Sequence, residues 1–201
     1  MFLLFILFSA VKVGVAEMRS LSAFVTMDYW RSTSRFPTAE EIEEVEVQLE
    51  TARDLANNDP EIHENLARLS LMRAAAADTA PAEKISRLRT GLSEIRIAIA
   101  LRPASPYSWA ILSTIKRDLG EYDSEFRQSL HRAVELGPWE PDLLTSLADV
   151  GLSAWPKMPP DEQELIQHVF VRGMEHQSKS MEDVAKVHRN ECAGKAGITC
   201  Q

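Results

Sequence analysis

The chain has 201 residues, of which 45% are hydrophobic and 26% are charged, and its formal net charge is −8 with histidine neutral. A chain of this length and apolar content folds around its own core, so a fibrous, low-complexity or disordered protein is excluded. The negative charge opposes a phosphate backbone, so general nucleic-acid binding is disfavoured and no nucleic-acid partner is expected.

Residues 1–27 are predicted to be a hydrophobic leader or a membrane anchor. Residues 1–11 read MFLLFILFSAV and carry no charged side chain, and Lys12 interrupts them. This stretch is shorter than the about 20 residues of a membrane-spanning helix, and it fits the apolar region of a secretory signal, which has about 7–15 residues. Gly14 and Ala16 are the small residues that a cleavage site before Glu17 requires. The basic residues that normally precede such a region are missing in front of it.

Three interpretations of this segment stay open. In the first, Met1 is a late start site and the segment is a cleaved leader. In the second, the helix stays uncut as a short anchor, and Lys12 extends toward the headgroup layer. Both interpretations predict that the protein belongs to the cell envelope. It is then either anchored in the inner membrane and facing the periplasm or secreted into the periplasm. In the third, the segment is a buried N-terminal helix of a cytosolic protein.

From Thr38 onward the apolar spacing is helical almost throughout. Thr38 and Glu41 form a capping-box pattern at the start of a helix that has one apolar and one acidic face. Prolines, glycines and asparagines separate the helices that follow. The predicted helices cover about residues 38–56, 61–77, 82–102, 106–119, 122–136, 141–154 and 161–177. Residues 179–201 are predicted to be a polar tail with one weak helical stretch, and since no segment alternates with period two, the predicted fold class is all-α.

The helix ends recur along the chain. Pro60, Pro103 and Pro138 each end one helix and precede another, at intervals of 43 and 35 residues. Each interval holds two helices, so residues 38–178 are predicted to form a domain of stacked antiparallel helical hairpins. A period near 34 residues is that of the tetratricopeptide (TPR) repeat.

The segment 102–138 carries the TPR pattern most clearly. An aromatic residue, a leucine, a Gly-Glu-Tyr turn, a small residue and a closing proline follow one another at Trp109, Leu112, 120–122, Ala133 and Pro138. Ser113 departs from the pattern, because the family often has glycine at that place. Small residues let neighbouring helices approach closely, so we expect Trp109 and Phe126 to fill the remaining gaps as core residues.

Four strings of the sequence point to a narrower group. LRPASPYSWA, LGEYDSEF, RAVELGPWEP and GLSAW together resemble the small repeat-containing accessory proteins of bacterial exopolysaccharide gene clusters, the VpsP-like family. The resemblance covers about residues 20–178. It implies one N-terminal hydrophobic segment, a few TPR-like hairpins and a role in polysaccharide production or export, and it supplies no catalytic residue.

In stacks of helical hairpins, the first helix of each pair lines the concave face. The predicted partner-binding residues are therefore Asn65, Arg68, Tyr107, Thr114 and Arg117. We expect a non-enzymatic adaptor or scaffold that binds proteins of a polysaccharide assembly machine. Arg68, Arg73 and Arg117 also suit an acidic peptide or an anionic glycan.

The sequence predicts neither a metal site nor a cofactor. His168 and His176 stand eight residues apart, whereas two histidines four apart on one helix give a strong metal signal. The five histidines are therefore expected to be solvated or to cap helices. Asp161, Glu162 and Glu164 open a helix, where carboxylates complement the helix dipole. The enzymatic alternative is a polysaccharide lyase or hydrolase that uses two of these carboxyls as an acid–base pair.

Cys192 and Cys200 are the two cysteines of the chain. In an oxidising compartment they are expected to form a disulfide, and in the cytosol they stay reduced. A metal site needs more ligands than the nearby His188 supplies. Free thiols would support a further alternative, a cytosolic TPR scaffold or co-chaperone.

Overall fold

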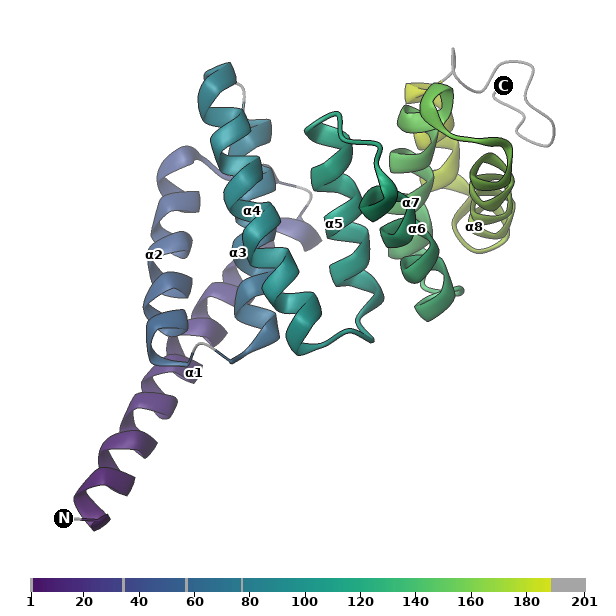
Figure 1. Ribbon diagram of the computed structural model, residues 1–201. Helices are drawn as coiled ribbons and strands as arrows, with labels where there is room; N and C mark the ends of the chain where they lie inside the picture. Colours follow the sequence, from purple (N-terminus) through teal and green to yellow (C-terminus); the bar gives the residue numbers. More distant parts are fainter. Residues whose placement is uncertain (1, 34, 57, 77, 189–201) are drawn as a thin grey trace. The chain divides into compact units, whose positions relative to one another are not determined.

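A computed structural model of the chain (Figure 1) describes residues 2–33, 35–56, 58–76 and 78–188, with side chains from Gly14 onward. Helices and turns account for the described residues, and no strand occurs among them, so the predicted all-α class is confirmed. The chain divides into two compact units, which we call unit 1 (residues 1–103) and unit 2 (residues 104–201). Each unit has its own hydrophobic core.

Unit 1 consists of four helices: α1 (Phe2–Ser32), α2 (Ala39–Leu55), α3 (Pro60–Ala75) and α4 (Pro81–Leu101). Each helix packs against the next one in the chain, and α2 runs along the left edge of this unit in Figure 1. Its core side chains come from α1, α2 and α3, and they are Ala23, Trp30, Ile42, Val45, Leu49, Ala52, Ile62, Leu66 and Leu69. The three helices predicted between residues 38 and 102 are confirmed with ends shifted by one or two residues.

Local side-chain contacts mark where α2 and α3 begin. The Thr38 backbone N–H donates to Glu41 Oε2 at 2.8 Å, and the Glu41 N–H donates to Thr38 Oγ1 at 3.3 Å, which completes the predicted capping box. At α3, the Glu61 N–H donates to Asp59 Oδ1 at 2.9 Å, and Pro60 occupies the first helical turn, where its missing N–H has no partner to lose.

Helix α1 extends beyond the predicted leader. It runs to Ser32 as one helix, and Ala16, Ala23 and Trp30 are buried in unit 1. The described part of the chain contains no helix that is long and apolar enough to cross a membrane. The latter half of α1 is therefore a structural element of unit 1.

Unit 2 consists of α5 (Pro106–Asp118), α6 (Ser124–Leu136), α7 (Pro141–Ala154), a short 3₁₀ helix η1 (Trp155–Lys157) and α8 (Pro160–Val187). Helices α5 and α6 form one antiparallel hairpin and α7 and α8 form another, and α7 also packs on α5. Gly120 has a φ of 72° in the α5–α6 turn, a conformation that favours glycine. Phe126 is fully buried, whereas Trp109 is half-buried and packs against the edge of the core.

The C-terminal end of unit 2 differs from the prediction. Helix α8 continues to Val187 across a kink at Gln177, which has φ −144° and ψ 58°. Met181 and Ala185 are buried in the unit 2 core, so residues 179–188 belong to the packed domain rather than to a polar tail. Cys192 and Cys200 lie outside the described residues.

Candidate functional site

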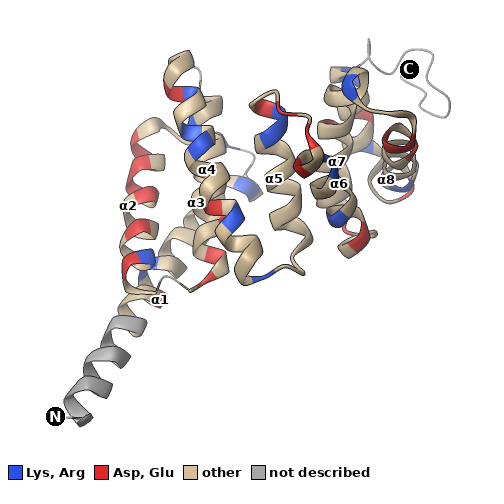
Figure 2. Cartoon of the chain, in the orientation of Figure 1, with Lys and Arg blue, Asp and Glu red and all other residues tan. Residues whose placement is uncertain are grey.

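Acidic residues recur along α2 (Figure 2). Ile42, Val45 and Leu49 occupy the opposite face and are buried. The residues of the acidic face are wholly or partly exposed, and they are Glu40, Glu43, Glu44, Glu46 and Glu50. The 3.6-residue period of the helix therefore presents a row of carboxylates to the solvent.

An open pocket of about 310 Å³ lies beside this row. Its walls come from three helices: α2 supplies the carboxylates, α3 supplies Arg73 and α4 supplies Arg87. The lining residues are Ala39, Glu43, Glu46, Val47, Glu50, Arg73 and Arg87. Three carboxylates and two guanidinium groups thus surround a space large enough for an amino-acid side chain of a partner.

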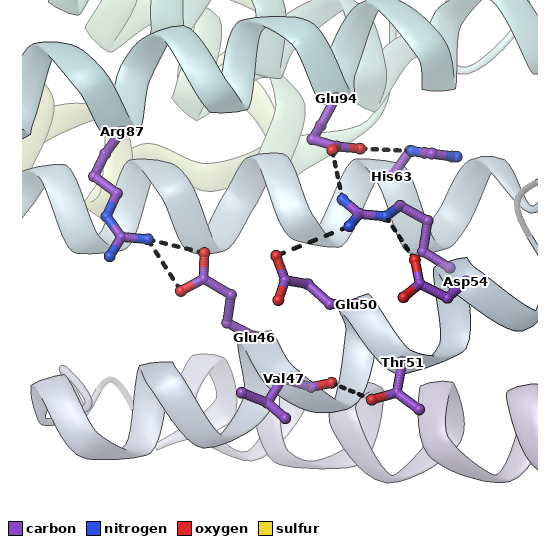
Figure 3. Close-up of polar contacts among 9 residues, drawn as sticks. Glu46, Val47, Glu50, Thr51, Asp54, His63, Arg87 and Glu94 are labelled. Atoms are coloured by element: carbon purple, nitrogen blue, oxygen red, sulfur yellow. Dashed lines mark hydrogen bonds and ion pairs between the residues drawn. The ribbon is translucent and has the colours of Figure 1, made fainter.

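The two arginines of the pocket are held differently. Arg87 Nη1 donates to both carboxylate oxygens of Glu46, at 3.0 and 3.1 Å (Figure 3), and its Nε lies 3.7 Å from Glu83. Arg73 Nε lies 3.9 Å from Glu83 Oε1, but Arg73 Nη1 is buried and has no hydrogen-bond partner. A buried donor without an acceptor costs free energy, so a ligand oxygen that reached Arg73 Nη1 would gain a favourable contact.

A buried ion-pair network connects the acidic helix to α3 and α4. His63 Nδ1 lies 2.6 Å from Glu94 Oε2, and Arg53 Nη1 donates to Glu94 Oε1 at 2.9 Å (Figure 3). Arg53 Nη2 lies 3.9 Å from Glu50 at the pocket wall. The prediction that all five histidines are solvated or cap helices is wrong for His63, because the Glu94 carboxylate satisfies its ring inside the core.

Of the residues of unit 1 that were expected to meet a ligand, Arg73 lines this pocket, whereas Asn65 and Arg68 do not. Asn65 Nδ2 donates to the Glu61 carbonyl at 3.0 Å, and Arg68 Nη2 donates to Glu64 Oε1 at 2.8 Å, so both bond within α3. Arg102 also donates to Glu64, at 3.2 Å. The apolar spacing of the sequence did not predict the pocket. The walls of the pocket combine residues about one repeat apart, and the periodicity of a single helix does not show that such residues lie close together.

The other three predicted binding residues lie in unit 2. Tyr107 Oη donates to Glu140 Oε2 at 3.0 Å, and Thr114 Oγ1 donates to the Ala110 carbonyl at 3.0 Å. Arg117 Nη1 donates to Asp149 Oδ2 at 2.5 Å, and its Nε donates to Asp118 Oδ1 at 2.9 Å.

Arg117 and Asp149 belong to a chain of polar groups across unit 2. Burial alone would lower the pKa of Arg117, but Asp118 and Asp149 outweigh burial and raise it. Burial alone would raise the pKa of Asp149, but the hydrogen bond with His188 Nε2, at 2.8 Å, and the charge of Arg117 hold it below its ordinary value. The guanidinium that was expected to meet a partner is thus neutralised within the fold.

An aromatic cluster in unit 2 was not predicted. Trp139 is 62% exposed, the Arg172 guanidinium carbon lies 4.6 Å from its ring centroid, and His176 meets it edge-on at 5.9 Å. Arg172 Nη1 also donates to the Pro138 carbonyl at 2.8 Å. The signal in the sequence was a tryptophan directly after the Gly137-Pro138 helix stop, where a core residue is not expected.

The carboxyls that begin α8 occupy different environments. Asp161 and Glu164 are exposed, and Glu164 lies 3.7 Å from the exposed His168. Glu162 is buried, and Arg127 Nε lies 3.2 Å from its Oε1. Burial raises the pKa of Glu162, and the Arg127 charge offsets this only in part. Across the described ranges, no group of three or more His, Cys, Asp or Glu side chains is placed to hold a metal ion.

Comparison with known proteins adds no relative. No family model matches the chain, and no curated protein matches its sequence. A function for this chain therefore has to be proposed from its own residues and their arrangement.

Proposed function

We propose that the chain is a non-enzymatic, TPR-like helical-repeat adaptor that binds a partner protein in exopolysaccharide biosynthesis or export. Two features of unit 2 support the repeat assignment. Its helices form two consecutive antiparallel hairpins, and the first helices of these hairpins, α5 and α7, pack on each other. Repeat proteins of this kind function by presenting surfaces to partners.

The acidic pocket of unit 1 is the observation that carries the binding proposal. Glu43, Glu46 and Glu50 line it on α2, so it suits a lysine or arginine side chain of a partner protein. Two of the predicted cations, Arg68 and Arg117, are already paired with carboxylates, so an acidic ligand has to displace Glu64 or Asp149 to reach them. A basic segment that docks on α2 has to compete with Arg87 for Glu46, but Glu43 on the same wall is exposed. The α2 pocket is therefore the proposed binding surface.

The pathway and the location are proposed on sequence grounds. The strings LRPASPYSWA, LGEYDSEF, RAVELGPWEP and GLSAW resemble the VpsP-like family, which implies a polysaccharide assembly machine. The uncharged residues 2–11 favour the cell envelope, with attachment to the inner membrane and exposure to the periplasm.

The test is a pull-down of the full chain from envelope extracts. We expect the wild-type protein to recover a glycosyltransferase or a polymer-export protein. Glu43→Lys combined with Glu50→Lys is expected to lose this partner, because both changes reverse the charge of the pocket wall. The matched control is Glu44→Lys, which lies on α2 outside the pocket and should retain the partner. Recovery of no glycan-pathway protein would contradict the proposal.

The alternatives are separated by two direct measurements. A purified chain that shortens a polysaccharide, and that loses this activity in Asp161→Asn or Glu164→Gln, would identify a lyase or hydrolase instead. Fractionation with the cytosol, together with reactive thiols at Cys192 and Cys200, would favour the cytosolic scaffold. We expect no chain shortening and recovery with the envelope.

A further inference from the structure

Helix α1 has two apolar faces. The face toward the rest of unit 1 contains Ala16, Ala23 and Trp30, which are 0–2% exposed. A second row of large apolar side chains lies away from the core and is 37–69% exposed. This row, which we call the α1 stripe, consists of Val15, Met18, Leu21, Val25 and Tyr29. Monomeric proteins rarely expose large contiguous apolar patches, so this row of five exposed apolar side chains on one helix is a candidate contact surface.

The spacing of the stripe is that of a coiled-coil seam. Positions 15, 18, 22, 25 and 29 follow steps of three and four residues, and every one except Ser22 is a large apolar residue. Leu21 flanks the position of Ser22. The charged residues Glu17, Arg19 and Asp28 fall outside these seam positions. An uncharged seam with a seven-residue period is the pattern by which two helices pair side by side.

We propose that the α1 stripe is the contact between two copies of this chain, which pair through a parallel two-helix coiled coil. Such a contact is two-fold symmetric, so each seam residue meets the same residue of the second copy. The charged residues beside the seam are compatible with this parallel pairing. In the parallel register, Arg19 faces Gly14 and Asp28 faces Thr33 of the second copy, so no like charges oppose each other.

A lipid surface is the competing occupant, and the charges of this region argue against it. Helices that lie on membranes combine an apolar face with a polar face rich in lysine and arginine. The opposite face of α1 is instead buried against the core of unit 1, and the neighbouring α2 carries a row of glutamates. Parallel pairing also directs both uncharged segments 2–11 the same way, so a dimer is compatible with attachment to one bilayer.

The contact is short. From Val15 to Tyr29 the helix rises roughly 21 Å, at 1.5 Å per residue, so pairing in dilute solution is expected to be weak. Confinement of both copies to one membrane would raise their effective concentration. The pairing should therefore be measured in cells, with the full chain at its own location, and it does not depend on which partner the acidic pocket binds.

The experiment is disulfide cross-linking in whole cells, in a full chain that carries Cys192→Ser and Cys200→Ser. Val25→Cys places a thiol on the seam, and Glu17→Cys places a thiol on the same exposed helix outside the seam. We expect a cross-linked dimer of the Val25→Cys chain to form about tenfold faster than that of the Glu17→Cys chain, because only the seam holds the two thiols together. Equal rates at the two positions would overturn the pairing.

A second variant separates pairing from misfolding. Met18→Glu, added to the Val25→Cys chain, sets two carboxylates against each other across the seam and should abolish the cross-link. Since Met18 is exposed, the variant is expected to retain its helicity by circular dichroism. Cross-linking that persists in Met18→Glu would overturn the proposal. A fluorophore on the Val25→Cys chain that shifts to the blue with phosphatidylcholine vesicles, without any cross-link, would assign the stripe to lipid instead.

Discussion

Lys116 shows how one side chain can join two helices. The residue lies on α5 and its side chain is 2% exposed. Its Nζ donates to Asp123 at 2.6 Å and to Glu125 at 3.0 Å, and it lies 3.1 Å from Glu121. Burial alone would lower the pKa of Lys116, but the three carboxylates outweigh burial and raise it. The charged ammonium therefore holds the α5–α6 turn and positions Asp123, whose Oδ1 accepts the Phe126 N–H that begins α6.

Lys116→Met is expected to lower the free energy of unfolding by about 1–3 kcal/mol. The methionine keeps the aliphatic packing, but it leaves three carboxylates without their countercharge. The loss stays below that of a fully buried pair, because the carboxylates are partly exposed and water relieves some of their repulsion. Urea unfolding followed by circular dichroism measures it. The control is Lys157→Met at an exposed position, and equal stabilities of the two variants would contradict this account.

At the scale of the helices, a glycine permits the close contact of α7 and α8. Gly151 is buried, and a Cβ added to it would lie 2.5 Å from both Cγ1 and Cδ1 of Ile166. A gap this small cannot hold another carbon atom unless the Ile166 side chain changes its rotamer or one helix shifts. The close approach of neighbouring helices, which is the expected role of small residues in the repeat, is thus observed at Gly151.

Gly151→Ala is expected to destabilise the protein by about 1–3 kcal/mol. Alanine favours a helix over glycine by about 1 kcal/mol, so the substitution would stabilise α7 if space allowed. Gly14→Ala on α1 is the matched control, since its Cβ would meet nothing within 4 Å. Thermal unfolding should show a lower midpoint for Gly151→Ala and an unchanged or higher midpoint for Gly14→Ala. A stabilised Gly151→Ala would show that α7 and α8 separate easily.

The helices could be predicted because their signals are local. Thr38, Asp59 and Gly120 act on backbone groups within a few residues, so sequence spacing locates the helix ends. The polar contacts between helices are not local: Glu46 and Arg87 are 41 residues apart, and His63 and Glu94 are 31 apart. Periodicity assigns a residue to a face but does not identify the element that covers the face.

The prediction of a polar tail failed for the same reason. Met181 and Ala185 are four residues apart, which is a helical signal, but the polar residues around them led to the prediction of a tail.

At the scale of the whole molecule, the ionisable groups predict how stability depends on pH. The shifted carboxyls Glu41, Asp123, Asp149 and Asp183 have lowered pKa values. A lowered pKa stabilises the fold above the pKa of the unfolded chain, about 4, and this contribution is lost as the pH falls through the folded pKa. The raised pKa of Lys116 stabilises the fold below the pKa of an unfolded lysine, about 10.4. This stabilisation is lost as the pH rises through the pKa of the folded state.

Asp149 is the carboxyl in which this dependence is best tested, because two contacts from different parts of unit 2 lower its pKa: the hydrogen bond with His188, which follows α8, and the ion pair with Arg117 on α5. Glu162 acts in the opposite direction, because its raised pKa stabilises the fold in acid. The contribution of Asp149 is therefore measured as the difference between the wild type and Asp149→Asn. We expect the unfolding free energy of the wild type to fall from about pH 5 downward. The fall should be smaller in Asp149→Asn, which begins less stable at pH 7 and has no proton to gain. Urea titrations at a series of pH values measure both slopes, with the exposed Asp78→Asn as the control. Parallel curves for the wild type and Asp149→Asn would mean that the Arg117–Asp149–His188 contact does not contribute to the acid sensitivity of unit 2.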